Sequence, residues 1–270
     1  MSRRVRVGIG LPNTTPGTTG RLIAEWARRA DAGPFSTLGV LDRLVYSSVE
    51  PFSALSAAAA VTERVGLATM IAIGPVRGTA MLAKQAQSVQ TLSDGRFTLG
   101  VAVGARRDDY EAAGVEHRTR GAVLSEQLAH LRSENTDVPI LVGGNSGAAF
   151  SRMARYADGY AHGGGPARAF ASAAAKARAA WHDLGRPGQP KLWGQAYFAL
   201  GDEDKGEAYL LDYYSFTGPF AQTVAAANLT TPRAVKDLVR GYANEGCDEL
   251  ILLPTVSSST QVERLAEVLA

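Results

Sequence analysis

Residues 65–103 read VGLATMIAIGPVRGTAMLAKQAQSVQTLSDGRFTLGVAV, and this stretch contains the repeating unit that decides the fold of the chain. Val65–Ile73 is almost continuously apolar, which is typical of a parallel strand buried on both faces. Thr79–Leu92 then places apolar side chains at helical spacing, and Ser93-Asp94-Gly95 ends the helix. Phe97–Val103 is the next apolar run. The stretch therefore predicts a strand, a helix and a second strand.

The same alternation continues on both sides of this stretch. Further strands are predicted at Val5–Leu11, Thr37–Leu41, Pro139–Val142, Gly159–His162, Leu192–Leu200 and Glu249–Leu253. Helices are predicted at Gly20–Ala32, Glu50–Arg64 and Pro166–Leu184, around Leu124–Leu131 and Phe150–Ala157, after Thr231, and from Thr260, which forms a capping box with Glu263. Eight βα units predict an α/β fold, a single-domain (β/α)8 TIM barrel over residues 1–270, because closure leaves no strand edge exposed.

Composition limits the partners and the compartment. The formal net charge is +2, from 28 basic and 26 acidic residues, so nothing predicts attraction to nucleic acid or to a membrane surface. Cys247 is the one cysteine, which excludes an internal disulfide and favours a reducing compartment. The apolar run within Met1–Leu11 is too short for the hydrophobic region of a secretory signal. No stretch approaches the ~20 apolar residues of a membrane helix. A cytoplasmic location is expected.

In a barrel of this type the active site is built at the carboxyl ends of the strands and by the loops after them. That position selects the candidate residues. They are Asn13 after the first strand, Asp42 and Arg43 after the second, Ala72, Ile73 and Gly74 at the end of the third, Gly104, Arg106 and Arg107 after the fourth, Gly143, Gly144, Asn145 and Ser146 after the fifth, and His162, Gly163, Gly164 and Gly165 after the sixth.

Two of these turns are rich in glycine and each enters a helix. Without side chains, the backbone N–H groups of Gly143–Ser146 and Gly163–Gly165 could approach a phosphate at a helix N-terminus. The same glycines could instead serve only to make tight turns between strand and helix. A phosphorylated cofactor and a purely structural role are both open at this point.

The charged and aromatic candidates also have two interpretations each. Arg106-Arg107 could neutralise a phosphate or a substrate anion, or form a solvated salt-bridged loop with the adjacent Asp108 and Asp109. His162 could act as an acid, a base or a hydrogen-bond donor, or be a structural histidine. A last group could line a substrate pocket or cover the bottom of the barrel; it consists of Tyr213, Tyr214 and Phe216. The remaining histidines have no spacing that predicts a metal site.

Six motifs, taken in order, resemble the luciferase-like monooxygenase superfamily. They are Val7-Gly8-Ile9-Gly10-Leu11-Pro12, Asp42-Arg43, Glu63-Arg64-Val65-Gly66-Leu67, Leu82-Ala83-Lys84-Gln85, Leu92–Gly100 and Val142-Gly143-Gly144-Asn145. The resemblance is strongest from Val5 to Gly114 and fades in the C-terminal third. It implies a commonly dimeric barrel that holds reduced FMN or the deazaflavin F420. It further implies a non-proline cis peptide at Ala72-Ile73 behind the ring, and phosphate contacts at the two glycine turns.

Several positions depart from the pattern of that family. Arg43 stands where many relatives carry a histidine, Ala105 where the sugar-phosphate F420 dehydrogenases carry a glutamate, and Val103 where bacterial luciferases carry a phosphate-binding arginine. The stretch Leu131–Pro139, between strands four and five, is shorter than in typical relatives. The expected family set of acid–base groups is therefore missing, and a more open pocket is expected.

The sequence thus predicts an oxidoreductase that uses FMN or F420 on a small organic substrate. Asp42, Arg43 and His162 are the predicted catalytic residues. The predicted cofactor contacts are Asn13, Ala72, Ile73, Gly74, Gly104, Arg106, Gly143, Gly144, Asn145, Ser146, Gly163 and Gly164, and no metal is expected. A non-catalytic flavin-binding barrel is the alternative, and a cofactor-free hydrolase is disfavoured because no nucleophile–base pattern or pair of carboxylates stands out.

Overall fold

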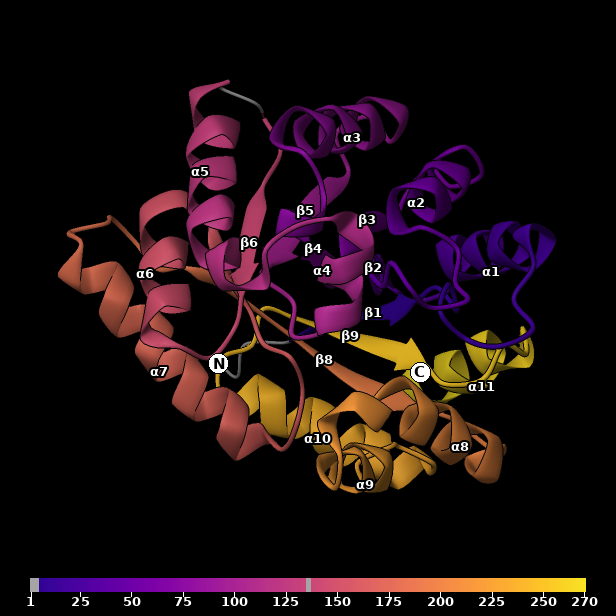
Figure 1. Cartoon of the computed structure of the whole chain (residues 1–270). Coiled ribbons are helices and arrows are strands. Elements are labelled where there is room, and N and C mark those ends of the chain that lie inside the picture. Colours follow the sequence, from indigo (N-terminus) through magenta and orange to yellow (C-terminus); the bar gives the residue numbers. More distant parts are fainter. Residues whose placement is uncertain (1–4, 135–136) are drawn as a thin grey trace.

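The strands of the computed structural model form one closed parallel barrel, and the structure describes residues 5–134 and 137–270 (Figure 1). The strands are β1 Arg6–Gly10, β2 Thr37–Val40, β3 Gly66–Thr69, β4 Ala72–Ile73, β5 Phe97–Ala102, β6 Ile140–Gly143, β7 Gly159–Ala161, β8 Lys191–Phe198 and β9 Glu249–Pro254. Expectations about Met1–Leu11 and Leu131–Pro139 lie partly outside the described residues. The predicted (β/α)8 barrel is confirmed.

The nine strand segments occupy eight barrel positions, because β3 and β4 are two parts of the third strand. Ala68 pairs with Thr98 of β5, whereas Ala72 pairs with Val101. Between these two pairs, three residues of the third strand therefore face two residues of β5, which defines a bulge at Thr69–Ile71. The bulge joins a lower part that pairs with β2 to an upper part that pairs only with β5.

The non-proline cis peptide lies within this bulge, at Met70–Ile71. The expected position at Ala72-Ile73 is wrong by two residues. The pairing explains the difference: the ladder with β2 continues up to Thr69, and the ladder with β5 resumes at Ala72. Ala72 and Ile73 are therefore regular strand residues, and the irregular backbone lies before them.

Within residues 5–134 and 137–270, eight helices surround the barrel and three further helices lie on its mouth side. The surrounding helices are α1 Gly20–Ala32, α2 Pro51–Ala59, α3 Thr79–Leu92, α5 Arg120–Ser133, α6 Gly147–Tyr156, α7 Ala167–Asp183, α10 Pro232–Asn244 and α11 Thr260–Leu269. The additional ones are α4 Arg107–Ala113, α8 Glu203–Tyr213 and α9 Phe220–Ala226. None of the helices in the described parts of the chain is long and apolar enough to cross a membrane.

Helix ends follow local capping signals except where a tertiary contact replaces them. The side chain of Thr231 accepts a hydrogen bond from the Ala234 N–H, which confirms the predicted start of α10. The capping box predicted for Thr260 and Glu263 is wrong, because α11 has no side-chain cap at its N-terminus. Glu263 instead pairs with Arg29 on the neighbouring helix α1.

Helix α2 is shorter than the predicted Glu50–Arg64. The Glu50 carboxylate caps its start by accepting from the Ser53 N–H at 2.8 Å. Its end comes at Ala59, since the following turn is held by the Asp31 carboxylate, which accepts the N–H groups of Glu63, Arg64 and Val65. Three backbone N–H groups that donate to one carboxylate thus replace the last predicted helical turn.

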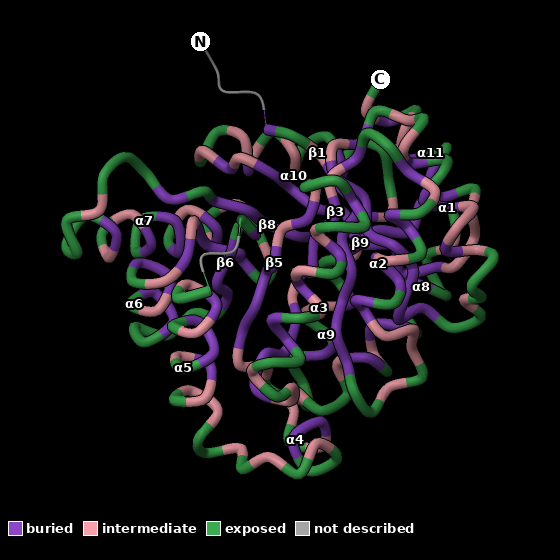
Figure 2. The backbone as a smooth tube through the Cα atoms, turned by 90° about the horizontal axis from the view of Figure 1, so that it is seen from above, coloured by how far each residue is buried: buried purple, intermediate pink, exposed green. Residues whose placement is uncertain are grey.

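The apolar core has two layers, and the strands are the most continuously buried part of the chain (Figure 2). The larger layer lies between the strands and the surrounding helices. The smaller layer fills the barrel and continues into α8 and α9; it includes Met70, Leu141, Trp193, Tyr197, Tyr209, Leu210, Tyr213, Ala225 and Ile251. Helices α8 and α9 therefore form a roof over the barrel mouth.

The roof segment leaves and rejoins the barrel at one place. The Ala199 N–H donates to the Leu229 carbonyl at 3.0 Å, and the Leu229 N–H donates to the Tyr197 carbonyl at 2.9 Å. Phe198 and Leu229 form an isolated parallel bridge there. Residues 200–228 are thus a loop whose two ends meet at the carboxyl end of β8.

Candidate active site at the barrel mouth

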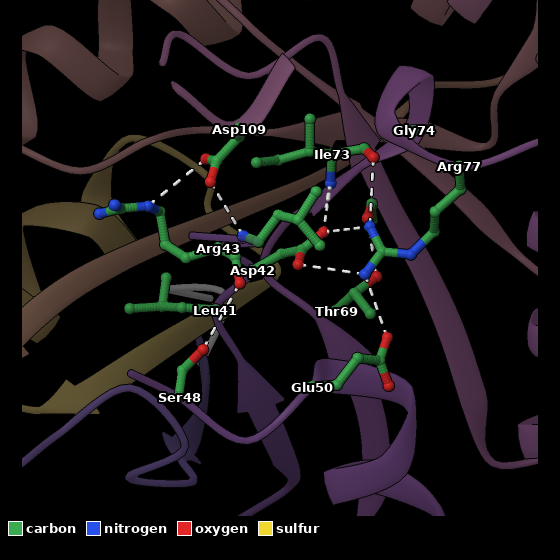
Figure 3. Close-up of polar contacts among 12 residues, drawn as sticks. Leu41, Asp42, Arg43, Ser48, Glu50, Thr69, Ile73, Gly74, Arg77 and Asp109 are labelled. Atoms are coloured by element: carbon green, nitrogen blue, oxygen red, sulfur yellow. Dashed lines mark hydrogen bonds and ion pairs between the residues drawn. The ribbon is translucent and has the colours of Figure 1, made fainter. Parts of the chain in front are cut away.

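A buried ion pair fixes the end of the third strand, and it is shown in Figure 3. The Arg77 guanidinium binds both carboxylate oxygens of Asp42, with Nη1–Oδ2 at 2.5 Å and Nη2–Oδ1 at 3.1 Å. Asp42 also accepts the N–H of Ile73 at 2.8 Å. Arg77 reaches Glu50 as well, at 3.0 Å. The pair therefore connects the loop after β2, the bulged third strand and the start of α2.

Burial and charge act in opposite directions on the Asp42 carboxyl. Burial raises its pKa, while the Arg77 charge and the hydrogen bonds from Arg77 and Ile73 lower it, and the net direction is upward. The contacts use both oxygens, so the geometry gives Asp42 a positioning role. Arg77 is not among the residues predicted from the sequence. Its signal was its place after the third strand, following Gly74-Pro75-Val76.

Arg43 is enclosed at the opposite side of the mouth. Its side chain is 4% exposed, and its guanidinium carbon lies 4.8 Å from the ring centre of Tyr46 and 5.1 Å from that of Tyr213. Its nearest carboxylate atom is Oδ2 of Asp109, 3.4 Å from Nε. Arg43 is thus held mainly by aromatic faces, which attract a guanidinium electrostatically.

Asp109 is fully buried and organises the rim loop after β2. Its Oδ1 accepts the N–H groups of Leu44 at 3.0 Å and Val45 at 2.9 Å. The solvated loop, which is one of the two interpretations of these charges from the sequence, is wrong for Asp109. The reason is that residues 107–113 form helix α4, whose first turn points Asp109 inward against Arg43.

Arg106 lies at the outer rim. Its Nε binds Asp108 at 3.0 Å, and its guanidinium carbon lies 4.6 Å from the ring centre of Phe216. Asp108 is 38% exposed in its side chain, so this pair is close to solvent. Arg106 therefore has both the salt bridge expected of a surface loop and a position next to the mouth.

The mouth cavity is bounded by these charged groups and by the bulge. It has a volume of ≈ 190 Å³ and is lined by Leu41, Asp42, Arg43, Met70, Ile71, Ile73, Gly104, Ala105, Arg106, Asp109, Gln195, Tyr213, Tyr214 and Phe216. The three aromatic residues of the roof thus line the mouth and do not cover the barrel bottom. The volume lies below the ~300–1,000 Å³ of typical small-molecule sites because these rings project over the opening.

A larger cavity, named the side cavity here, adjoins the mouth cavity. It has a volume of ≈ 440 Å³ and shares the lining residues Gln195 and Tyr214 with the mouth cavity. Gly163, Gly164 and Gly165, after β7, form one of its walls. The predicted candidates therefore fall into two groups: Asp42, Arg43, Ile73, Gly104 and Arg106 at the mouth, and the second glycine turn beside it.

The other predicted residues line neither of these two cavities. The Asn13 amide donates to the carbonyls of Leu41 at 2.8 Å and Val49 at 3.0 Å, so it joins two loops. The Gly143–Ser146 turn leads into α6, where Ser146 caps the helix by accepting the Ala149 N–H at 3.2 Å. Ala72 is buried in the strand, and the Gly74 carbonyl accepts from Gln127 at 3.1 Å.

His162 is buried below the second glycine turn. Its ring centre lies 6.3 Å from that of Tyr160 and 5.7 Å from that of Phe170. Burial lowers the pKa of His162, and the nearby polar backbone of Gly164 offsets part of this effect. The environment therefore favours a neutral imidazole at neutral pH.

This environment makes the stability pH-dependent in a definite direction. Because the folded-state pKa of His162 is lowered, the unfolded chain binds the proton more readily, and the free energy of unfolding is expected to fall as the pH drops below about 6.5. Urea denaturation between pH 7.5 and 5 measures this slope. His162→Gln should reduce the slope, whereas substitution of the exposed His182 should leave it unchanged. Equal slopes in both variants would contradict the assignment.

Comparison with known proteins places this geometry in context. Residues 5–133 match the family model described as luciferase-like monooxygenase. An uncharacterized protein from Mycobacterium tuberculosis (strain ATCC 25618 / H37Rv) is 34% identical over 141 residues, covering 43% of this chain and 49% of that protein. The match thus spans about half the length of the curated relatives.

Solved structures share the fold over nearly the whole chain. An F420-dependent secondary alcohol dehydrogenase in complex with an F420–acetone adduct superposes with a TM-score of 0.83 at 14% identity, covering 98% of each chain. The oxygenating constituent of 3,6-diketocamphane monooxygenase from Pseudomonas putida, in complex with FMN, gives a TM-score of 0.71 at 13% identity, covering 92% of this chain and 91% of that chain. At these identities the likeness shows the barrel fold.

Proposed function

We propose that this chain, which carries a luciferase-like monooxygenase sequence over residues 5–133, is an oxidoreductase that binds a reduced flavin or F420 at its barrel mouth. The proposal rests on one observation above all. The mouth cavity is backed by the bulged third strand, where Met70, Ile71 and Ile73 line it with apolar side chains, and Arg43 and Arg106 line it beside Asp42 and Asp109. FMN and F420 are both flat ring systems with an anionic tail, so the two parts of the site match the two parts of either cofactor.

The floor of the mouth fits a flat ring. Met70, Ile71 and Ile73 supply apolar surface, Gly104 has no side chain that would intrude, and Gly143 lies behind Ile71. A Cβ on Gly143 would lie 2.5 Å from Cδ1 of Ile71. At the entrance, Phe216 is 43% exposed. We propose that rotation of this exposed ring away from Arg106 provides the extra space that a tricyclic ring requires.

The phosphate of the cofactor is assigned to the first glycine turn. The backbone of Gly143, Gly144 and Asn145 enters the ten-residue helix α6, and the exposed turn leaves room for an anion at its N-terminus. Gly163 and Gly164 lie in the neighbourhood of the phosphate in this arrangement. Arg106 adds positive charge at the rim, next to the ring.

The residues at the mouth mainly position the reactants. When bound, a reduced flavin or F420 supplies the two electrons of the reaction, to oxygen or to an organic substrate. Asp42 and Arg77 hold the backbone at Ile73 beneath the ring. Arg43 fixes the rim loop and orients negative charge that develops near the mouth. The buried, neutral His162 supports the turn after β7.

Titration of the purified protein with each cofactor tests the proposal. Quenching of FMN fluorescence, or a shift in the absorption spectrum of F420, should report saturable binding of one of the two. Binding of FMN alone or of F420 alone decides between the two chemistries. If neither oxidised nor reduced forms of either cofactor bind, the proposed function is wrong. Light scattering of the same sample tests the homodimer that the family resemblance implies.

Replacing Gly143 tests the position of the ring. In Gly143→Ala the new methyl group meets Cδ1 of Ile71 and forces that side chain towards the mouth cavity. We expect about tenfold weaker cofactor binding, ~1.4 kcal/mol, with little loss of stability because the end of a flexible side chain can move. Gly20→Ala, at the first turn of α1, is the matched control, since nothing lies within 4 Å of its Cβ position. Equal affinities of both variants would place the ring elsewhere.

A non-catalytic flavin-binding protein is the second candidate. The contacts of Asp42 and Arg43 favour it. Asp42 is paired with Arg77, and Arg43 is held by Asp109 and by aromatic faces. Neither is free to exchange protons with a substrate. If reduced cofactor bound to the protein is reoxidised at one rate with and without a panel of neutral organic substrates, this second candidate is supported over the first.

A further inference from the structure

The side cavity opens beside the mouth on the β7–β8 side of the barrel. Its volume of ≈ 440 Å³ is within the ~300–1,000 Å³ of small-molecule sites. Its walls come from the turn after β7, from β8, and from helices α9 and α10. Gln195 and Tyr214 line both cavities, so they form the partition between the side cavity and the mouth cavity.

The walls of the side cavity are mainly apolar, with Gln195 and Thr223 as polar lining residues besides two tyrosines. Ala196, Val224 and Leu238 face it, and Phe220, which is 59% exposed, lies at its edge. Every described residue that lines it is uncharged at neutral pH. A charged ligand group would lose its hydration there without gaining a countercharge, and that loss is costly. The body of the ligand that fits this cavity is therefore neutral and apolar.

A pair of hydroxyl groups lies at the partition. The hydroxyl oxygens of Tyr197 and Tyr214 are 2.7 Å apart and share one hydrogen bond. That bond uses one of the two hydroxyl protons, so the other can be donated to an oxygen acceptor. Burial raises the pKa of both tyrosines, which keeps both protonated. The pair thus offers one hydrogen-bond donor at the end of a mainly apolar cavity.

We propose that the side cavity binds the apolar body of a neutral carbonyl substrate, whose oxygen accepts a hydrogen bond from the Tyr197–Tyr214 pair. The inference rests on the proposed function, since Tyr214 would hold that carbonyl at the edge of the cavity assigned to the cofactor ring. A straight-chain ketone is the simplest molecule with both properties. The side cavity therefore indicates neutral carbonyl compounds as the substrate class of the proposed oxidoreductase.

Calorimetric titration of the cofactor-free protein with 2-hexanone, 2-heptanone, 2-octanone and 2-nonanone tests the cavity directly. Each added methylene group should tighten binding about fourfold until the cavity is full. Carboxylates of the same chain lengths should bind at least tenfold more weakly. Affinities that do not change with chain length, or carboxylates that bind as well as ketones, would overturn the inference.

Two neighbouring substitutions locate the binding. Ala226 and Ala227 are both exposed at the end of α9, but only Ala227 lines the side cavity. We expect Ala227→Trp to weaken ketone binding at least tenfold and Ala226→Trp to leave it unchanged within twofold. Ketone binding that is unaffected by Ala227→Trp would exclude the side cavity as the site.

The double variant Tyr197→Phe/Tyr214→Phe tests the hydroxyl pair. Removing both hydroxyls leaves no unpaired partner, so the fold should be retained. Binding of 2-heptanone should weaken about fivefold, while binding of 1-octene, which has no acceptor oxygen, should not change. An equal effect on both ligands would show that the pair is not the hydrogen-bond donor.

Cofactor titration of Ala227→Trp separates this inference from the proposed function. Unchanged affinity for FMN or F420, together with lost ketone binding, supports two distinct cavities. Loss of cofactor binding in Ala227→Trp would assign the side cavity to the cofactor. It would overturn the inference and the placement of the ring at the mouth, while the proposed oxidoreductase activity stands. Ketone binding in a protein that binds neither cofactor would overturn the proposed function and keep the ligand site.

Discussion

Arg77→Ala is expected to lower the free energy of unfolding by about 3–5 kcal/mol. The substitution leaves the Asp42 carboxylate buried without the guanidinium that binds both of its oxygens. It also removes the contacts of Arg77 with the Glu50 carboxylate and with the Ile73 carbonyl of the bulged strand. Urea denaturation followed by circular dichroism measures the loss.

Two further variants give the Arg77 prediction its controls. Arg233→Ala removes an exposed pair with Asp237 and should cost at most about 1 kcal/mol. The double variant Asp42→Asn/Arg77→Met removes both buried charges and should recover most of the loss, because no unpaired charge remains. A loss in Arg77→Ala no larger than that in Arg233→Ala would show that the buried pair does not hold the mouth together.

Gly100→Ala is expected to have the second large effect, a loss of about 3 kcal/mol or more. Its Cβ would lie 2.2 Å from the Thr69 carbonyl oxygen, which is backbone and cannot rotate away. The Thr69 hydroxyl also donates to the Gly100 carbonyl at 2.7 Å, so the two strands are held close at the bulge. Relief of the clash requires β3 and β5 to separate where the barrel closes.

Thermal and urea denaturation of Gly100→Ala should therefore show a marked loss that a surface glycine does not reproduce. Gly20→Ala, at the first turn of α1, places its methyl group where nothing lies within 4 Å and should change stability by less than about 1 kcal/mol. Should Gly100→Ala be as stable as Gly20→Ala, the close approach of Thr69 and Gly100 would not be a constraint on the barrel.

The barrel could be predicted because its signals are local. Thr79–Leu92 is helical over the predicted range, and the stop at Ser93-Asp94-Gly95 corresponds to left-handed backbone at Asp94 and Gly95. Apolar runs such as Leu67–Thr69 and Phe97–Ala102 became strands for the same reason. Each of these elements depends on neighbours within a few residues along the chain.

The contacts of the site join residues that lie far apart in the sequence, so they could not be predicted from local patterns. Asp42 and Arg77 are brought together by strand pairing, so no spacing in the sequence indicates their ion pair. The position of Asp109 depends on the short helix α4. The run of charged residues at 106–109 is also typical of a solvated loop, so this helix could not be predicted from the sequence. For the roof the signal was present: Tyr209, Leu210 and Tyr213 are the buried face of α8 and follow helical spacing.

The meeting of Tyr197, Ala199 and Leu229 at the carboxyl end of β8 makes the roof structurally separable from the barrel wall. Residues 200–228 begin and end at the carboxyl end of β8. This segment can therefore be exchanged as a unit without altering the order of the eight strands or the closure of the barrel. Replacement of residues 200–228 would therefore change what covers the mouth and leave the strands beneath it in place.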